Sequence, residues 1–232
     1  MEKIIHQIWV GPYEMPDREK RLVESTKETN PDFQHFLWTD ENIPILEPHI
    51  QVLCDNFRER EDYAFLADVL RVCLVREYGG IYLDVDWKPH KAFNDLSLED
   101  YDGVIIYHDT FTTGNEVFGS KSKNGFIEYA YQELFKGELN HEFGPYWFNQ
   151  KLRHYFNTEV SQDETSEENK VVGLEFLETL KRSNIRVIKR HGEFEKIYSE
   201  HLGLHSWCHT HKEFFKEGNI NYQQTVYNRE WN

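Results

Sequence analysis

Short apolar runs and amphipathic stretches alternate along the first half of the chain, and turn-forming residues separate them. Apolar positions recur every second residue in a strand and about every 3.6 residues in a helix. These periods predict strands at residues 3–10 and 33–38, a helix at 17–29 that Asn30 and Pro31 end, and a further helix around 50–57. The order predicts an α/β fold, a sheet with helices packed on it, in which ligands gather at the carboxyl ends of the strands.

The second half of the chain shows the same alternation less regularly. The pattern predicts a strand at 101–107, a short strand within 115–120, helices at 124–136, 146–156 and 173–181, and a strand at 185–188. Residues 158–170 are acidic and almost without apolar side chains, which predicts a mobile surface loop. The length of 232 residues suits one domain, so we interpret residues 1–232 as a single domain.

Two carboxylates follow a short apolar run at residues 79–87 (GGIYLDVDW). In an extended strand, Asp84 and Asp86 point to the same face while Val85 between them points into the core. Two adjacent anions repel each other unless a proton or a cation lies between them, and hard oxygen ligands suit Mg2+ or Mn2+ that also binds substrate phosphates. The pair therefore predicts a divalent-metal site for a phosphorylated ligand, although a bare Asp-x-Asp is also compatible with two solvated carboxylates in a turn.

The residues before this motif predict a helix at 61–78 that is buried nearly all round. Gly79 suits the position just past the helix end, where a left-handed backbone is easiest without a side chain. Asp68 and Arg71 stand three residues apart in this helix and therefore share a face. Charged side chains on a buried helix must pair with each other or face a ligand cavity, and both alternatives remain open at this point.

These residues carry a resemblance to a known family. Residues 63–71 (YAFLADVLR) and 78–86 (YGGIYLDVD) resemble the signature of glycosyltransferase family 32, the glycosyltransferases with a sugar-binding region containing a DXD motif, which are related to the catalytic domains of clostridial glucosylating toxins. Residues 3–11 (KIIHQIWVG) resemble the opening strand of that family, and residues 205–207 (HSW) resemble its closing segment. The sequence departs from the pattern at Ala67, where the family commonly has Ser, and this departure leaves the charged residues intact.

The resemblance implies a single GT-A-type, Rossmann-like nucleotide-sugar transferase domain with a mixed central sheet flanked by helices. It implies catalytic residues Arg71, Asp84 and Asp86, and a metal bound by Asp84, Asp86 and His205. The donor-binding residues that it implies are Trp9, Asp68, Arg71, Tyr82, Asp84, Ser206 and Trp207.

The same resemblance assigns roles within this site. Trp9 is expected to stack on the nucleotide base, and Asp68, Arg71 and Tyr82 are expected to hold the sugar hydroxyls. The implied cofactor is Mn2+ or Mg2+, and the implied partners are a UDP- or GDP-sugar donor and a glycan or other hydroxyl acceptor. The family retains the anomeric configuration, which requires no protein nucleophile. Asn115 lies in a segment where the family commonly has an Asn near the sugar.

Composition narrows the class of ligand. The net charge of −15 argues against nucleic-acid binding, which needs clustered Lys and Arg. A strongly acidic chain binds a negatively charged nucleotide donor more easily with a cation, which favours the metal already expected. The aromatic content of 15% is high enough to indicate a sugar-facing cleft.

The sequence also carries expectations about compartment. No stretch approaches the roughly 20 apolar residues of a membrane span, and the N-terminus lacks the basic head and apolar core of a secretion signal. We therefore expect a soluble, cytoplasmic protein without an integral membrane segment. The three cysteines, Cys54, Cys73 and Cys208, are odd in number and widely spaced, which suits reduced thiols.

Histidines gather near the C-terminal end of the chain, together with one of the cysteines. The group consists of His201, His205, His209, His211 and Cys208. Such residues can bind Zn2+, but a structural zinc site usually takes paired ligands from two places in the chain. The closing loop of the family explains this region better, and it leaves His205 as the candidate third ligand of the donor-site metal.

Three other classes of protein can carry paired carboxylates. A haloacid dehalogenase-type phosphatase also has Asp-x-Asp after an apolar strand, but its motif requires Thr or Val where this chain has Lys88. A glycosidase places its two carboxyl groups about 5 to 9.5 Å apart on opposite sides of a sugar, which adjacent residues of one strand cannot easily do. A sugar-nucleotide or glycan-binding protein without turnover is the third alternative.

Overall fold

The computed structural model describes residues 1–108, 112–136, 144–158 and 167–201. Strands and helices alternate in its first half, within a few residues of the predicted bounds. The elements are β1 (Ile4–Ile8), α1 (Asp17–Thr29), β2 (Gln34–Trp38), α2 (Pro48–Glu59), α3 (Tyr63–Tyr78) and β3 (Gly80–Leu83).

The second half is built from shorter elements. They are β4 (Trp87–Pro89), the 3-10 turns η1 (Phe93–Leu96) and η2 (Leu98–Asp100), β5 (Gly103–Tyr107), β6 (Thr113–Ser120), α4 (Gly125–Leu134), α5 (Pro145–Tyr155), α6 (Glu167–Arg182), β7 (Ile185–Lys189), the π-helical turn η3 (Arg190–Phe194), α7 (Glu195–Ile197) and β8 (Ser199–His201).

One prediction for this half needs correction, and two short strands were missed. The acidic stretch predicted as a loop at 158–170 is helical from Glu167 on, because α6 begins six residues before the helix predicted at 173–181. Its central part, residues 159–166, lies outside the described residues. The strands β4 and β8 were not predicted, because a three-residue strand is too short to show a period.

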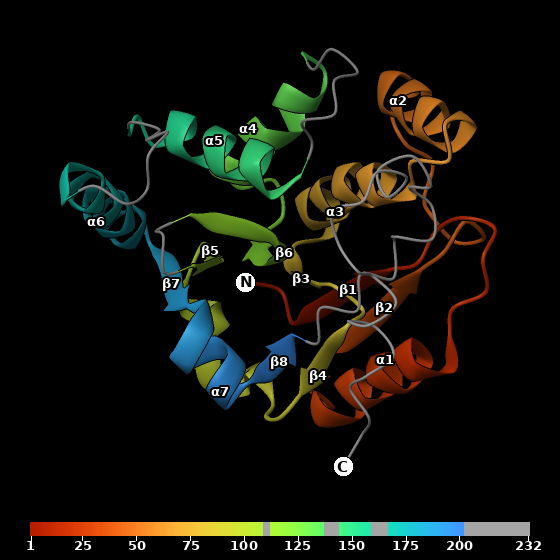
Figure 1. Cartoon of the computed structure of the whole chain (residues 1–232), viewed down its shortest axis with the longest axis horizontal. Helices are drawn as coiled ribbons and strands as arrows, with labels where there is room; N and C mark the ends of the chain where they lie inside the picture. Colours follow the sequence, from red (N-terminus) through yellow and green to blue (C-terminus); the bar gives the residue numbers. More distant parts are fainter. Residues whose placement is uncertain (109–111, 137–143, 159–166, 202–232) are drawn as a thin grey trace, which may run out of the picture.

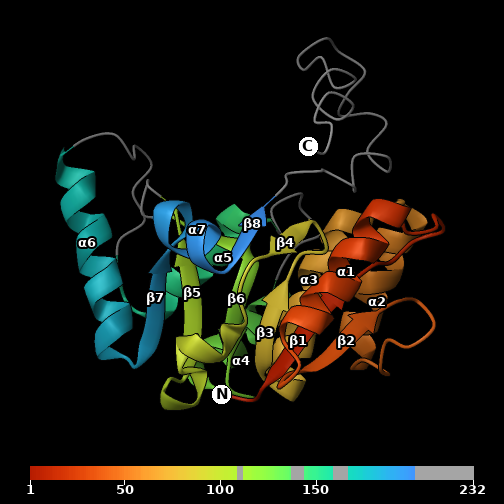
Figure 2. The ribbon, with the colours of Figure 1, turned by 90° about the horizontal axis from the view of Figure 1, so that it is seen from below.

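The six-stranded sheet has the order β2-β1-β3-β6-β5-β7 (Figure 1). β1 pairs in parallel with β2 and β3, and β5 pairs in parallel with β7. β6 is antiparallel to both β3 and β5, so the other strands all end at the same edge of the sheet. Figure 2 shows α6 beside β7 at one end of this sheet and α1 and α2 near β2 at the other. The predicted mixed sheet flanked by helices is confirmed.

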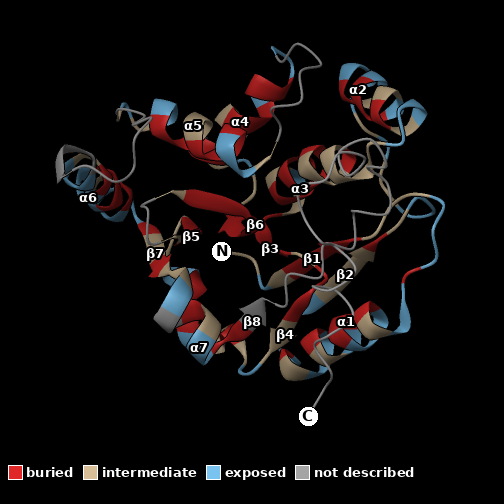
Figure 3. Cartoon of the chain, viewed as in Figure 1, coloured by how far each residue is buried: buried red, intermediate tan, exposed pale blue. Residues whose placement is uncertain are grey.

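Apolar side chains alternate between the two faces of the sheet, whose inner strands β1, β3, β5 and β6 are mostly buried (Figure 3). Tyr82 and Phe118 belong to the larger core cluster, which includes residues of α2 to α6. Ile81, Leu83 and Val117 belong to a second cluster on the opposite face, together with residues of η1 and η3. The period of two that marks a strand thus divides neighbouring residues between two cores.

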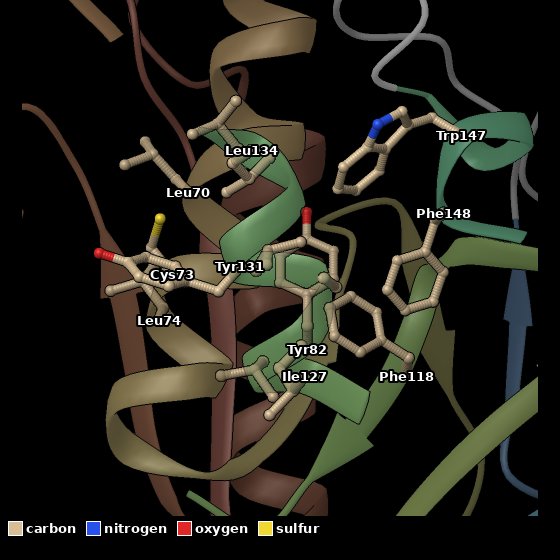
Figure 4. Packing of buried hydrophobic residues seen from close by; sticks show 14 of the residues in the cluster. Leu70, Cys73, Leu74, Tyr82, Phe118, Ile127, Tyr131, Leu134, Trp147 and Phe148 are labelled. Atoms are coloured by element: carbon tan, nitrogen blue, oxygen red, sulfur yellow. The ribbon is translucent and has the colours of Figure 1, made fainter. Parts of the chain in front are cut away.

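Helix α3 lies inside the larger core. Its fully or nearly fully buried apolar residues are Leu66, Val69, Leu70, Val72, Cys73, Leu74 and Val75. Figure 4 shows Leu70 and Leu74 in this cluster with Tyr131 and Leu134 of α4, and Tyr82 of β3 near Phe118. The prediction of a helix buried nearly all round is confirmed, so any charged side chain on α3 needs a partner.

Two glycines connect α3 directly to β3. The backbone of Gly79 has φ 68°, and its N–H donates to the carbonyl oxygen of Val75 at 2.9 Å. Gly80 has φ 94°, and a Cβ at this position would lie 2.5 Å from the carbonyl oxygen of Ile4. The second glycine therefore permits both the left-handed backbone and the close approach of β3 to β1.

A buried histidine forms a hydrogen bond with the first residue of this connection. His6 of β1 donates from Nε2 to the carbonyl oxygen of Gly79 at 2.7 Å and accepts at Nδ1 from the indole N–H of Trp38 at 3.0 Å. These two partners fix the neutral tautomer with the proton on Nε2. Burial lowers the pKa of His6 to about 4. This His6 network therefore stays uncharged at neutral pH.

Two of the three cysteines lie in the described part of the chain. Cys54 and Cys73 are buried free thiols, which confirms the expected reduced state for this pair, and Cys208 lies outside the described residues. Within the described ranges, no helix has the length and apolar character that a membrane crossing requires.

Candidate functional site

The functional candidates meet at the edge where the parallel strands end. Trp9 follows β1, Asp84 follows β3, His108 follows β5 and Arg190 follows β7. Because β6 runs in the opposite direction, its first residues, including Asn115, start from this edge. The topology therefore brings the candidate functional side chains together at the carboxyl ends of the parallel strands, as predicted.

Arg71 is the centre of a buried polar network. Its Nη1 donates to the carbonyl oxygen of Asn115 at 2.7 Å, and its Nη2 lies 3.1 Å from Asp68 Oδ1 and 3.4 Å from Asp84 Oδ1. The guanidinium also lies over the ring of Tyr82, 4.4 Å from its centre. The side chain of Arg71 is only 8% exposed, so it is a buried cation between two carboxylates.

Asp68 lies one turn before Arg71 on the same face of α3, as their spacing predicts. Its Oδ1 accepts a hydrogen bond of 2.7 Å from the side-chain amide of Asn115. Burial raises the pKa of Asp68 to about 7, against the opposing effects of Arg71 and Asn115. The sequence left open whether Asp68 and Arg71 form a plain ion pair, and the structure shows both residues connected to the motif that follows β3.

Asp84 completes this network. The hydroxyl of Tyr82 donates to Asp84 Oδ1 at 2.5 Å. Burial, together with repulsion from Asp86, raises the pKa of Asp84 to about 6, although Arg71 and Tyr82 favour its ionised form. The Asp84 side chain is 29% exposed and so reaches solvent. We call Asp68, Arg71, Tyr82 and Asp84 the Arg71 network.

The Asp-Val-Asp motif does not form the extended strand that the sequence predicts. β3 ends at Leu83, and Val85 and Asp86 form a turn before β4. The backbone N–H of Asp84 still bonds to the carbonyl oxygen of Glu116 in β6. The residues that follow turn away from β6, so the strand ends here. Val85 is nevertheless buried, in a small cluster with Met15 and with Val23 of α1. The two carboxylates therefore share one edge through a turn that is anchored by Val85.

The residues of this turn fit a divalent cation. Repulsion between Asp84 and Asp86 is the kind of charge excess that a cation relieves. In the described part of the chain, no group of three or more His, Cys, Asp or Glu side chains forms a complete metal site. A cation bound here would take its remaining ligands from water and substrate phosphates, which is how proteins usually bind Mg2+.

Other predicted site residues lie in different surroundings. Trp9 is partly buried beside the Val85 cluster, and its indole N–H donates to the carbonyl oxygen of Tyr13 at 2.8 Å. His205, Ser206 and Trp207 lie outside the described residues, as does the rest of the predicted histidine cluster after His201. The roles expected for these residues stay predictions.

Several charged residues near the turn were not predicted. Glu116 Oε1 accepts from Arg190 Nη1 at 2.9 Å and lies 3.1 Å from His108 Nε2. In the sequence, Glu116 precedes a short apolar run at 117–118, and Arg190 follows the predicted strand at 185–188. Neither pattern is specific for a functional site. Pairing between strands far apart in sequence brings these groups together.

This edge of the sheet is distinguished by its charged side chains and not by a deep pocket. A surface hollow of about 600 Å3 lies at the opposite edge of the sheet, between α4, α5 and α6, and another of about 410 Å3 lies beside α2. Their linings are mainly uncharged or carry paired ions, whereas the Arg71 network contains two carboxylates with raised pKa values around a buried cation. Such groups are typical of functional sites.

Comparison with known proteins finds a family model that matches the first part of the chain. Residues 16–102 match the family model described as the glycosyltransferase sugar-binding region containing DXD motif. An uncharacterised glycosyltransferase of Acanthamoeba polyphaga mimivirus is 30% identical over 140 residues, which cover 57% of this chain and 55% of that protein. Inositol phosphoceramide mannosyltransferase 2 of Schizosaccharomyces pombe is 30% identical over 142 residues, which cover 58% of this chain and 38% of that protein.

The fold has a counterpart among solved structures. The PaToxG glycosyltransferase superposes with a TM-score of 0.57 and 18% sequence identity, covering 78% of this chain and 76% of the other. This chain spans about half the length of the mimivirus relative and less of the mannosyltransferase. The family match and the fold agree with the resemblance drawn from residues 63–86. Residues 16–102 of this chain thus match the glycosyltransferase sugar-binding region containing DXD motif, and the described fold is of the GT-A type.

Proposed function

We propose that this chain is a metal-dependent glycosyltransferase that moves a sugar from a nucleotide diphosphate donor to a hydroxyl acceptor. The observation that carries the proposal is the Arg71 network, which joins the DXD turn to α3 at the edge of the sheet. Similarity to an inositol phosphoceramide mannosyltransferase supports a hexose donor. A UDP- or GDP-linked hexose and a glycan or other hydroxyl acceptor are the partners that we propose.

The Arg71 network supplies the groups that a sugar needs. Carboxylates accept hydrogen bonds from sugar hydroxyls, and Asp68, whose pKa is about 7, can also donate when protonated. Arg71 holds both carboxylates and balances part of their charge. In this proposal Asp68, Arg71 and Tyr82 orient the donor sugar, and Trp9, which packs against the cluster that contains Val85, stacks on the base.

Asp84 and Asp86 are the residues that we propose to hold Mn2+ or Mg2+, with His205 as a further ligand. When bound, the cation stabilises the negative charge that develops on the leaving diphosphate. Tyr82 orients the carboxylate of Asp84 through its hydroxyl, and Ser206 and Trp207 are proposed to contact the donor. We also propose retention of the anomeric configuration, with the acceptor attacking on the face that the diphosphate leaves.

The remaining alternatives make different predictions about ligands. A phosphatase of the haloacid dehalogenase type acts on phosphorylated compounds without need for a nucleotide, and a binding protein holds a sugar nucleotide without breaking it. The position of the motif after β3, and not after the first strand, disfavours the phosphatase. The family match at residues 16–102 favours the transferase over both.

A thermal-shift screen of UDP- and GDP-sugars with and without Mn2+ tests the proposal. A ligand at 100 times its dissociation constant stabilises the native state by about 2.7 kcal/mol, which such a screen detects. We expect stabilisation that requires both the metal and one nucleotide, followed by slow hydrolysis of that donor. Binding without hydrolysis or transfer would favour the binding protein, and stabilisation by phosphorylated compounds alone would favour the phosphatase.

Asp86→Ala should remove the metal-dependent stabilisation. The matched control is Asp95→Ala, which deletes an exposed carboxylate of η1 that pairs with Lys91 away from the turn. Calorimetric titration with Mn2+ and the nucleotide distinguishes the two variants. An unchanged donor affinity in Asp86→Ala removes Asp86 from the proposed metal site.

A further inference from the structure

A second charged cluster lies behind the DXD turn. Its central ion pair joins Glu116 of β6 to Arg190 at the end of β7, with Nη1 and Oε1 2.9 Å apart and both side chains less than 15% exposed. Arg190 also donates from Nε to Glu195 Oε1 at 2.8 Å, and His108 lies 3.1 Å from Glu116. Although burial opposes ionisation, His108 and Arg190 lower the pKa of Glu116 to about 2. Glu116 is therefore a fixed anion in a buried ion pair.

This ion pair is attached to both ends of the turn. At the first end, the carbonyl oxygen of Glu116 accepts the backbone N–H of Asp84 at 3.0 Å. At the other end, the guanidinium of Arg190 lies 5.5 Å from the ring centre of Trp87, the residue that follows Asp86. Trp87 is fully buried and packs edge-on against Phe194 at 5.4 Å. The two residues of one ion pair thus hold the residues on either side of Val85 and Asp86.

An irregularity in β6 makes this attachment possible. Ile105 of β5 pairs with Phe118, but Tyr107 pairs with Thr113, so β6 contains extra residues between these two pairs. A bulge of this kind re-aims side chains next to active sites. Here it lets Asn115 bond to Asp68 while its neighbour Glu116 bonds to Arg190. One short segment of β6 therefore connects the Arg71 network to the second charged cluster.

We propose that Arg190 is a positioning residue for the DXD turn, and this inference rests on the proposed function. Asp84 and Asp86 repel each other, so without external support the turn relaxes to separate them and loses affinity for a shared cation. The pair of Arg190 and Glu116 resists this relaxation by holding Asp84 through a backbone hydrogen bond and Trp87 through a cation–π contact. Groups that orient metal ligands from behind in this way typically change metal affinity about 10- to 100-fold.

The chemistry of the contact requires arginine. Arg190 uses two different nitrogens for Glu116 and Glu195, and its guanidinium carbon lies 5.5 Å from the ring centre of Trp87. A lysine ammonium is a compact charge that can keep one carboxylate but cannot reproduce the guanidinium fork that reaches both. The conservative variant should therefore restore only part of the function.

Binding of Mn2+ in the presence of UDP tests this role without using catalytic activity. The free Mn2+ signal in electron paramagnetic resonance gives the dissociation constant for the wild type, Arg190→Ala, Arg190→Lys and Arg186→Ala. The last variant is a matched control, because Arg186 of β7 also lies over an aromatic ring, that of Tyr101 at 5.3 Å, and bonds to its hydroxyl at 3.1 Å near the opposite edge of the sheet.

We expect Arg190→Ala to weaken Mn2+ binding at least tenfold, Arg190→Lys to weaken it at least threefold, and Arg186→Ala to leave it unchanged. Wild-type affinity in Arg190→Ala, or an equal loss in Arg186→Ala, overturns the positioning role alone. Should Arg190→Ala fail to fold, Arg190→Lys decides: a threefold loss supports the role and no loss overturns it. If the wild type binds no Mn2+ with UDP, the proposed metal site fails and the positioning role fails with it.

Discussion

Two buried polar networks flank the α3–β3 unit, and they differ in how their charge is balanced. In the His6 network, both imidazole nitrogens have neutral partners, and burial keeps the ring uncharged. In the Arg71 network, one guanidinium lies between two carboxylates whose pKa values are raised to about 7 and about 6. The first network is complete without a ligand, whereas the second carries more negative charge than its own cation balances.

The difference indicates what each network contributes. Buried neutral groups with satisfied hydrogen bonds stabilise a fold and lose nothing when no ligand is present. Buried carboxylates with raised pKa values cost stability, and such a cost is typical of residues retained for binding. Changes to the two networks should therefore affect different properties, and the predictions below test that separation.

The largest expected effect is that of Arg71→Ala. This change leaves the largely buried Asp68 and the partly exposed Asp84 without their cation, and removing one partner of a buried ion pair typically costs about 3–5 kcal/mol of the free energy of unfolding. The control is Arg76→Ala, because Arg76 also lies on α3, 4.4 Å from the ring centre of Tyr131, and pairs with Glu128, but with more exposure. Its loss should cost about 1 kcal/mol, as for a partly exposed ion pair.

Chemical denaturation of both variants measures this difference. The deficit of Arg71→Ala should shrink at pH 5, below the raised pKa values of Asp68 and Asp84, because the carboxylates that Arg71 leaves behind are then protonated. Equal losses in the two arginine variants at pH 7 would contradict the distinct role of Arg71.

An intermediate effect is expected from the titration of His6. Its pKa is 6.5 when unfolded and about 4 in the native state, so the unfolded chain binds the proton first as the pH falls. The stability contributed by neutral His6 is complete above pH 6.5 and is lost between pH 6.5 and 4, a loss of about 3 kcal/mol at 1.36 kcal/mol per pH unit. Urea denaturation at several pH values in this range should show that the free energy of unfolding falls less steeply with decreasing pH in His6→Gln than in the wild type. Parallel slopes would show that His6 is not the group responsible.

The smallest expected effect is that of Tyr82→Phe. The change removes only the hydroxyl that donates to Asp84, so it should weaken metal-dependent donor binding about tenfold while leaving the fold intact. Tyr101→Phe is the control, since it removes a hydroxyl bonded to Arg186 away from the turn. Calorimetric titration of the donor in the presence of Mn2+ distinguishes the two. A large loss of stability without loss of affinity would place Tyr82 with the structural residues.

Local sequence signals predicted the first half of the fold well. The helix at 17–29 has its predicted bounds, and Gly79 ends α3 where the sequence placed it. The same signals identified Asp68, Arg71 and Asp84, because residues three apart on a helix and a carboxylate after a strand are local features. These parts depend on neighbours in the sequence, which the hydrophobic pattern describes directly.

The parts that depend on distant pairing were not predictable in the same way. Asp84 and Asp86 were expected on one extended strand, but β3 ends at Leu83, and the chain turns away from β6 after the hydrogen bond between Asp84 and Glu116. The irregular start of β6, which aims Asn115 and Glu116 at different partners, has no local signature. Arg190 likewise gains its place only when β7 pairs with β5.

The connection from β6 to α3 has a consequence for the order of folding. Asn115 lies 47 residues from Asp68, and Arg190 lies 74 residues from Glu116. Contacts at such separations form only after large loops have closed, which slows their formation. The segment 16–102 that matches the family model ends before Asn115, so it contains the DXD carboxylates without the strand that holds them. Competence for binding should therefore arise late in folding, when the chain has already closed its sheet.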